Sequence, residues 1–209
     1  MQLSVLAILV SLLTSVNSLL SLRGNWSLID VRFLFFLALG QFPAIVFGIG
    51  LLNFLESNEV WILKVILGSF LVLGGLLSFI NPRPLKRISG RLTVFLAGIL
   101  GGTLGGLFSA SGPVLGLFAY SQPMPVAQIR ATLLASFLFT TTARTAVVSF
   151  QGSIKPEILM LFLLALPIVL LGTFLGKKIL PPVSESTTRR FAFSIILMIG
   201  FWTVLETIL

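Results

Sequence analysis

Long apolar runs recur along the whole chain and constrain its fold more than any other feature. A helix needs about 20 apolar residues to cross the roughly 30 Å hydrocarbon core of a bilayer. We expect a membrane-crossing helix at each run of that length, near 2–21, 32–54, 60–80, 130–149, 157–176 and 190–209. The connections are short and none is polar enough for a soluble domain. The sequence therefore predicts an all-α, polytopic integral membrane protein with a single domain, 1–209.

Composition excludes several classes of protein. Of the 209 residues, 56% are hydrophobic and only 10% are charged, whereas about 25% are charged in soluble domains. The chain has no Cys and no His, so disulfides, thiol chemistry and most transition-metal sites are excluded, and we expect no metal and no cofactor. Membrane enzymes usually carry His clusters or paired acids for metal or acid–base chemistry, so we do not expect an enzyme.

The two halves of the chain resemble each other. FPAIVFG at 42–48 matches LPIVLLG at 166–172, with Pro and Gly five residues apart in both. Transporters are commonly built from two repeats that are inverted relative to each other in the membrane. We therefore expect two three-helix repeats, 1–80 and 91–209.

A glycine-rich stretch, GGTLGGLFSASGPVLGLF at 101–118, lies between the third and fourth expected crossings. Pro113 has no N–H and disfavours helical geometry at Gly112, so we expect the helix to break at 109–113. Broken helices in transporters place free N–H and C=O groups at a substrate site, and the N-terminus of a helix starting at Pro113 would suit an anion. The alternative is a kinked helix. For Gly98 to Gly102 we expect close helix packing.

The basic residues indicate how this stretch lies in the membrane, because cytoplasmic loops carry an excess of Lys and Arg. If residues 92–121 form a re-entrant hairpin, eleven basic residues fall on one face and only Lys64 and Lys155 on the other. If the stretch crosses once, the split becomes seven against six. The sequence therefore predicts a hairpin, which also inverts the repeats. Loops beside anionic lipid explain the net charge of +8 without nucleic acid.

Few polar side chains lie within the expected crossings. Arg144 is either a fixed cation for an anionic substrate, helped by hydroxyls such as that of Thr141, or it snorkels to the headgroups. Asn17 lies beside the equivalent position in the first repeat and would supply a neutral donor there. For Gln41, two residues before Pro43, we expect bonds to the carbonyls that this proline frees.

These residues carry a family resemblance. GGLFSASGPVLGLF, followed by PMPVAQIRAT, is similar to the second signature of the TauE/SafE family, also called TSUP, of sulfite and organosulfur-anion exporters and permeases. The resemblance covers essentially the whole chain. Ser109 and Ser111 stand where glycines are usual, and a first glycine-rich element would have to precede Met1. We expect a fragment of a longer reading frame; the alternatives are a second subunit that fills the gap, or a degenerate form.

The resemblance implies a secondary transporter of small anions, sulfite or sulfonates, that works by alternating access in a cell membrane, with the bacterial inner membrane as the expected location. The alternative is a non-catalytic membrane helper subunit or a degenerate or truncated transporter half. Expected partners are the small anion, the lipid bilayer and, in one alternative, a second copy in a homodimer. The expected substrate-binding residues are Ser109, Ala110, Ser111, Gly112, Pro113, Thr141 and Asn17, with Arg144 or Arg130 supplying the charge.

Overall fold

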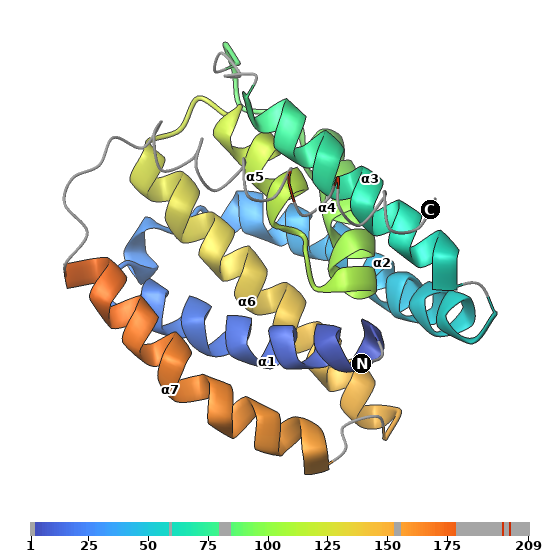
Figure 1. Ribbon diagram of the computed structural model, residues 1–209. Coiled ribbons are helices and arrows are strands. Elements are labelled where there is room, and N and C mark those ends of the chain that lie inside the picture. The colour runs from blue at the N-terminus through green and yellow to red at the C-terminus, as the bar shows by residue number, and fades with distance from the viewer. Residues whose placement is uncertain are drawn as a thin grey trace.

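The computed structural model describes residues 3–58, 60–79, 85–152 and 156–178, together with Met198 and Phe201. Every regular element in these parts of the chain is a helix. In chain order they are α1 (Leu3–Leu22), the short 3₁₀ helix η1 (Trp26–Leu28), α2 (Val31–Asn58), α3 (Val60–Phe79), α4 (Arg91–Phe108), α5 (Gly112–Tyr120), α6 (Val126–Phe150) and α7 (Pro156–Lys178). Figure 1 shows α1 and α6 in the middle of the molecule, with α7 flanking α1 at its edge.

Five helices within the described residues are long and apolar enough to cross a bilayer, namely α1, α2, α4, α6 and α7. The expected all-α, multi-pass membrane protein is thereby confirmed. The helices found at the first five expected crossings begin and end within about one turn of the expected bounds. The sixth expected crossing, 190–209, lies outside the described residues except for Met198 and Phe201.

Glycines bring α2 and α4 into direct backbone contact. A Cβ on any of three α4 glycines would collide with a carbonyl oxygen of α2, so no larger residue fits at these positions. The contacting pairs, in order along both helices, are Gly98 with Leu37, Gly102 with Gln41, and Gly106 with Ile45. Because the partners advance together, α2 and α4 run parallel. The close helix packing expected for Gly98 to Gly102 is therefore confirmed.

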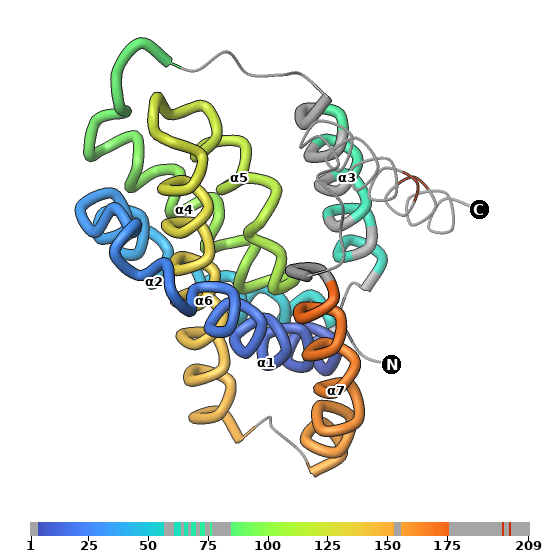
Figure 2. Tube along the Cα trace, turned by 90° about the vertical axis from the view of Figure 1, so that its left-hand side faces the viewer, coloured from blue at the N-terminus to red at the C-terminus, as the bar shows by residue number. Residues whose placement is uncertain are grey.

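α4 and α5 form the two arms of a helical hairpin (Figure 2). The backbone N–H of Leu85, before α4, donates to the carbonyl oxygen of Ser121, after α5, at 2.8 Å. The N–H of Ser89 donates to Oε1 of Gln122 at 2.9 Å. These bonds join the start of α4 to the end of α5, so the chain returns to the end of the molecule from which it set out. This is the hairpin geometry expected for 92–121; its depth in the bilayer and the inversion of the repeats stay predictions.

One end of the molecule collects the loops that precede α2, α4 and α6. The N–H of Asp30, before α2, donates to Oγ1 of Thr132 in the first turns of α6 at 3.0 Å. We call this the basic end, because its exposed side chains include Arg23, Arg32, Lys86, Arg87, Arg91 and Arg130. The opposite end, where α1 begins and α6 ends, is called the far end. This arrangement agrees with the one-sided distribution of basic residues expected for a hairpin.

Two of the apolar clusters in the interior lie at different depths, and polar side chains lie between them. The cluster nearer the basic end includes Phe33, Leu37, Val94, Leu115 and Leu133. The cluster nearer the far end consists of Ile8, Ile45, Ile49, Val148 and Ile158. Between the two, buried polar residues replace apolar ones on both α2 and α6. The candidate site lies at this depth.

Candidate functional site

Eight polar side chains lie in a layer between the two apolar clusters, in three hydrogen-bonded groups: Ser11 with Ser109 and Arg144, Ser15 with Thr141, and Gln41 with Ser136 and Thr140. These residues, here called the polar layer, are Ser11, Ser15, Gln41, Ser109, Ser136, Thr140, Thr141 and Arg144. Each is hydrogen-bonded to another member, as buried polar groups in an apolar interior must be if they are not to carry a large desolvation cost. The layer lies about half-way along α1 and α6, the depth at which transporters with broken helices bind substrate.

The break between α4 and α5 is an abrupt change of backbone direction at Ser109. This residue has φ 56° and ψ 26°, the left-handed conformation, and its N–H donates to the carbonyl oxygen of Gly105. A non-glycine residue pays about 1–2 kcal/mol for this conformation, and no other described non-glycine residue has a positive φ. The Oγ atoms of Ser109 and Ser11 lie 2.9 Å apart, which ties the break to α1. The helix is thus broken, as expected, rather than kinked.

Arg144 reaches from α6 to this break. Its Nε donates to the carbonyl oxygen of Gly106 at 3.0 Å and its Nη1 to Oγ of Ser11 at 3.1 Å. Because α4 ends at Phe108, the Gly106 carbonyl lies among the last four of the helix and has no amide donor within it. The negative end of the α4 dipole also favours a cation there. Arg144 is only 1% exposed and turns into the protein, which does not match the snorkelling alternative.

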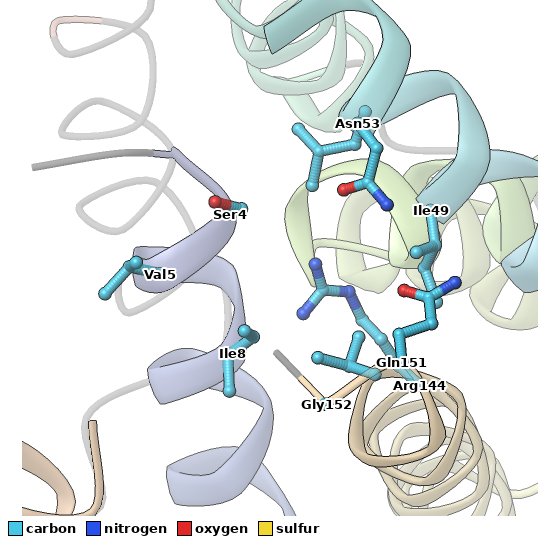
Figure 3. Close-up of a pocket in the computed structure, with 10 residues that line it drawn as sticks. Ser4, Val5, Ile8, Ile49, Asn53, Arg144, Gln151 and Gly152 are labelled. Carbon is cyan, nitrogen blue, oxygen red and sulfur yellow. The ribbon is translucent and has the colours of Figure 1, made fainter. Parts of the chain in front are cut away.

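A cavity of about 290 Å³ extends from the far end to Arg144 (Figure 3). Its walls come from α1, α2 and α6, with Ile8, Ile49 and Val148 as apolar members and Ser4, Asn53 and Gln151 as polar ones. In Figure 3 the guanidinium of Arg144 extends between α1 and α2. Arg144 is the only charged residue among the described residues that line the cavity. At about 30 Å³ per water molecule, there is room for roughly ten waters or a small oxyanion.

Several predicted site residues are brought together in this region. Thr141 accepts a hydrogen bond from Oγ of Ser15 at 2.8 Å and so belongs to the polar layer with Arg144. Ser111 is buried at the N-terminus of α5, where its hydroxyl makes no capping bond. The half-buried residues beside it at the break are Ala110, Gly112 and Pro113.

Two predicted site residues lie elsewhere. Oδ1 of Asn17 accepts a hydrogen bond from Oγ1 of Thr173 at 2.7 Å, so this side chain faces α7 and not Arg144. Arg130 is exposed at the basic end, and its backbone is about 20 Å from that of Arg144 along α6 at 1.5 Å per residue. Of the two arginines expected to supply the charge, Arg144 is therefore the one at the break.

Gln41 belongs to the polar layer. The sequence did not predict that it would. Its Nε2 donates to Oγ of Ser136 at 3.0 Å and to Oγ1 of Thr140 at 2.9 Å. The expected bonds to carbonyls freed by Pro43 are therefore wrong. A signal for Ser136 and Thr140 was present in the sequence, because both stand at four-residue intervals before Arg144 and so share its face of the helix.

Comparisons with known proteins agree with the resemblance noted in the sequence. The sequence model of the family described as sulfite exporter TauE/SafE matches residues 1–203. A curated protein of Cupriavidus necator, "Probable sulfite/organosulfonate exporter TauE", is 38% identical over 202 residues, which cover 97% of this chain and 79% of that protein. No solved structure matches. Because this is a family of membrane transporters, the expectation that the chain is not an enzyme is confirmed, and the chain belongs to the sulfite exporter TauE/SafE family.

Proposed function

We propose that this chain is a secondary transporter of small anions, with sulfite or organosulfonates as its substrates. The observation that carries the proposal is Arg144, a buried cation at mid-depth with a cavity that reaches it from the far end. Among the described residues, no carboxylate is bonded to it. Charges inside a membrane are costly and are usually retained for function. An anion in the cavity would supply the missing counter-charge.

The electrostatics around Arg144 favour an anion with several oxygens. The guanidinium has five N–H donors, of which the one on Nε bonds Gly106 and one of the two on Nη1 bonds Ser11. The N-terminus of α5, next to Ser111, adds partial positive charge at the same break. A sulfite or sulfonate group carries its acceptor oxygens on a single sulfur, so a guanidinium fork can bind two of them at once.

The position of the polar layer supports alternating access. Ser11, Ser15 and Gln41 come from the proposed first repeat, 1–80, and the other members from the proposed second repeat, 91–209. Movement of one inverted repeat against the other would open and close a layer of this kind. The apolar clusters on either side would then act in turn as the closed seal toward the basic end and the far end.

The name of the Cupriavidus relative, a probable sulfite/organosulfonate exporter, supports the same substrate class. We place the chain in the bacterial inner membrane with its basic end in the cytoplasm, because cytoplasmic loops carry the excess of Lys and Arg. The exposed apolar side chains of α7 then face lipid, or a second copy in the homodimer alternative. In this orientation the cavity opens away from the cytoplasm.

Flux measurements in proteoliposomes test the proposal. Purified protein is reconstituted and the uptake of radiolabelled sulfite, ethanesulfonate and sulfate is measured, with labelled choline as the cation control and protein-free liposomes as the blank. We expect saturable uptake of sulfite or the sulfonate, mutual competition between them, and no uptake of choline. A folded protein that carries none of the anions would overturn the proposal and favour a helper subunit.

A further inference from the structure

The amide of Gln41 is held between two hydroxyls of α6. Its Nε2 donates to Oγ of Ser136 at 3.0 Å and to Oγ1 of Thr140 at 2.9 Å, and the residue has no exposed surface. Oγ1 of Thr140 donates in turn to the carbonyl oxygen of Ser136 at 2.9 Å. The N–H groups of the amide are therefore satisfied because α2 is closed against α6.

These hydroxyls belong to a buried polar stripe on one face of α6. Thr132, Ser136, Thr140 and Arg144 follow at intervals of four residues, and none is more than 2% exposed. Residues four apart lie on the same face of a helix, so at 1.5 Å per residue the stripe extends about 18 Å from the basic end to the cavity. Apolar side chains would pack this face without burying hydroxyls, so packing alone does not account for the stripe.

The stripe continues where the cavity stops. Arg144 lines the cavity, whereas Gln41, Ser136 and Thr140 do not. Thr140 is one turn nearer the basic end than Arg144, and Gln41 bonds to it from α2. A substrate that reaches Arg144 from the far end therefore meets this cluster next on its way to the basic end.

We propose that Gln41, Ser136 and Thr140 form a second anion-binding station, which opens when α2 and α6 separate. On separation the N–H groups of Gln41 lose both acceptors and the hydroxyl of Ser136 loses Oε1 of Gln41, and buried donors need replacements. The hydroxyl of Thr140 keeps its bond to the Ser136 carbonyl within α6 but loses the amide that donates to it. A sulfite or sulfonate ion supplies several acceptor oxygens to the freed donors. The donors are neutral, so they hold an anion less tightly than Arg144 does and allow it to leave. The station rests on the proposed function and gives it a second binding step.

Hydrogen bonds between membrane helices can also serve only to hold the helices together. The chain offers a matched control for that alternative. Thr140 accepts a hydrogen bond from the amide of Gln41 and donates to the carbonyl oxygen of Ser136, four residues earlier. The hydroxyl of Thr173 shares its one proton between the amide oxygen of Asn17 and the carbonyl oxygen of Val169, also four residues earlier. Thr173 lies on α7, outside the polar layer. Thr140→Val and Thr173→Val therefore each remove one hydroxyl that bonds a side-chain amide of another helix, although Thr140 accepts in its bond and Thr173 donates.

The experiment compares the wild-type chain with both variants in proteoliposomes. Flux of labelled sulfite reports transport, and the rise in unfolding temperature that sulfite causes in detergent reports binding at Arg144. We expect Thr140→Val to lower flux by about tenfold and Thr173→Val by less than about twofold, with the sulfite-induced rise retained in both. Gln41→Glu keeps the size of the side chain but turns a carboxylate toward the anion, and should lower flux further.

If the two valine variants carry sulfite at the same rate, whether that rate is the wild-type rate or a lower one, the proposed second binding site is wrong. The bonds of Gln41 to Ser136 and Thr140 would then only hold α2 against α6. If Thr140→Val does not fold, Ser136→Ala is compared with Thr173→Val by the same criterion. Failure of the proposed function gives a different result, because the wild-type chain itself would then carry neither sulfite nor a sulfonate, and the station would be overturned with it.

Discussion

Nε of Arg144, six residues before the end of α6, donates a hydrogen bond to the carbonyl oxygen of Gly106 in the last turn of α4, 3.0 Å away. Two features that are costly in a membrane, a buried charge and a broken helix, thereby stabilise each other. An intact helix would have no free carbonyl at this position, and an apolar residue at 144 would leave that carbonyl without its partner. The site therefore depends on α4 staying where its contacts with α2 place it.

Gly48→Ala should destabilise the protein because α2 and α4 would have to move apart. A Cβ on Gly48 would collide with the carbonyl oxygen of Thr103, whereas a Cβ on Gly50, also on α2, would meet nothing within 4 Å. We expect Gly48→Ala to lower the free energy of unfolding by about 1–3 kcal/mol, and Gly50→Ala to raise it by up to about 1 kcal/mol. Unfolding in detergent measures both, and equal stability of the two variants would contradict the backbone contact.

Ser109→Gly should be more stable than Ser109→Ala. Both variants lose the hydroxyl that lies 2.9 Å from Oγ of Ser11, so the difference between them isolates the backbone. Glycine adopts the φ of 56° without strain and alanine does not, which favours the glycine variant by about 1 kcal/mol. Chemical unfolding of the two proteins in the same detergent gives this difference. An alanine variant as stable as the glycine variant would mean that residue 109 is not in the left-handed conformation.

Single cysteines in this cysteine-free chain test the arrangement of the loops. Ser27, in η1, and Lys86, before α4, are exposed at the basic end, and Ser149 is exposed at the far end. A membrane-impermeant maleimide should label Ser27→Cys and Lys86→Cys from the cytoplasmic side and Ser149→Cys from the other side, following the bias of basic loops. Labelling of Lys86→Cys and Ser149→Cys from the same side would exclude this topology.

Hydropathy was sufficient to locate the helices, and the chemistry of Pro113 was sufficient to locate the break. Both depend on local properties, the apolar length needed to cross a bilayer and the missing proline N–H. The charge of the loops likewise favoured a hairpin, and the bonds from Leu85 to Ser121 and from Ser89 to Gln122 close one. These parts of the fold require no knowledge of which helices touch.

The polar layer could not be predicted in the same way. Its contacts join residues far apart in the chain, such as Ser11 with Arg144 and Gln41 with Thr140. A membrane helix is apolar on nearly every face, so its pattern does not indicate which face is buried against another helix. Asn17 shows the consequence, because alignment of the two halves placed it beside the position equivalent to Arg144, as a donor in the site, whereas α1 turns it toward α7.

Flux of labelled sulfite through reconstituted Arg144→Gln tests most directly the central claim, that Arg144 is the fixed cation of an anion-binding site. A hydrogen bond to a charged group contributes about 1.5–3 kcal/mol, so flux should fall roughly 10- to 100-fold. Flux through Arg144→Lys, which keeps the charge but loses the forked guanidinium, should fall less than flux through Arg144→Gln. Flux through Arg32→Gln, a change of an exposed arginine at the basic end, should stay within about twofold of the wild-type flux. Wild-type flux in Arg144→Gln, at equal amounts of protein in the liposomes, would contradict the claim.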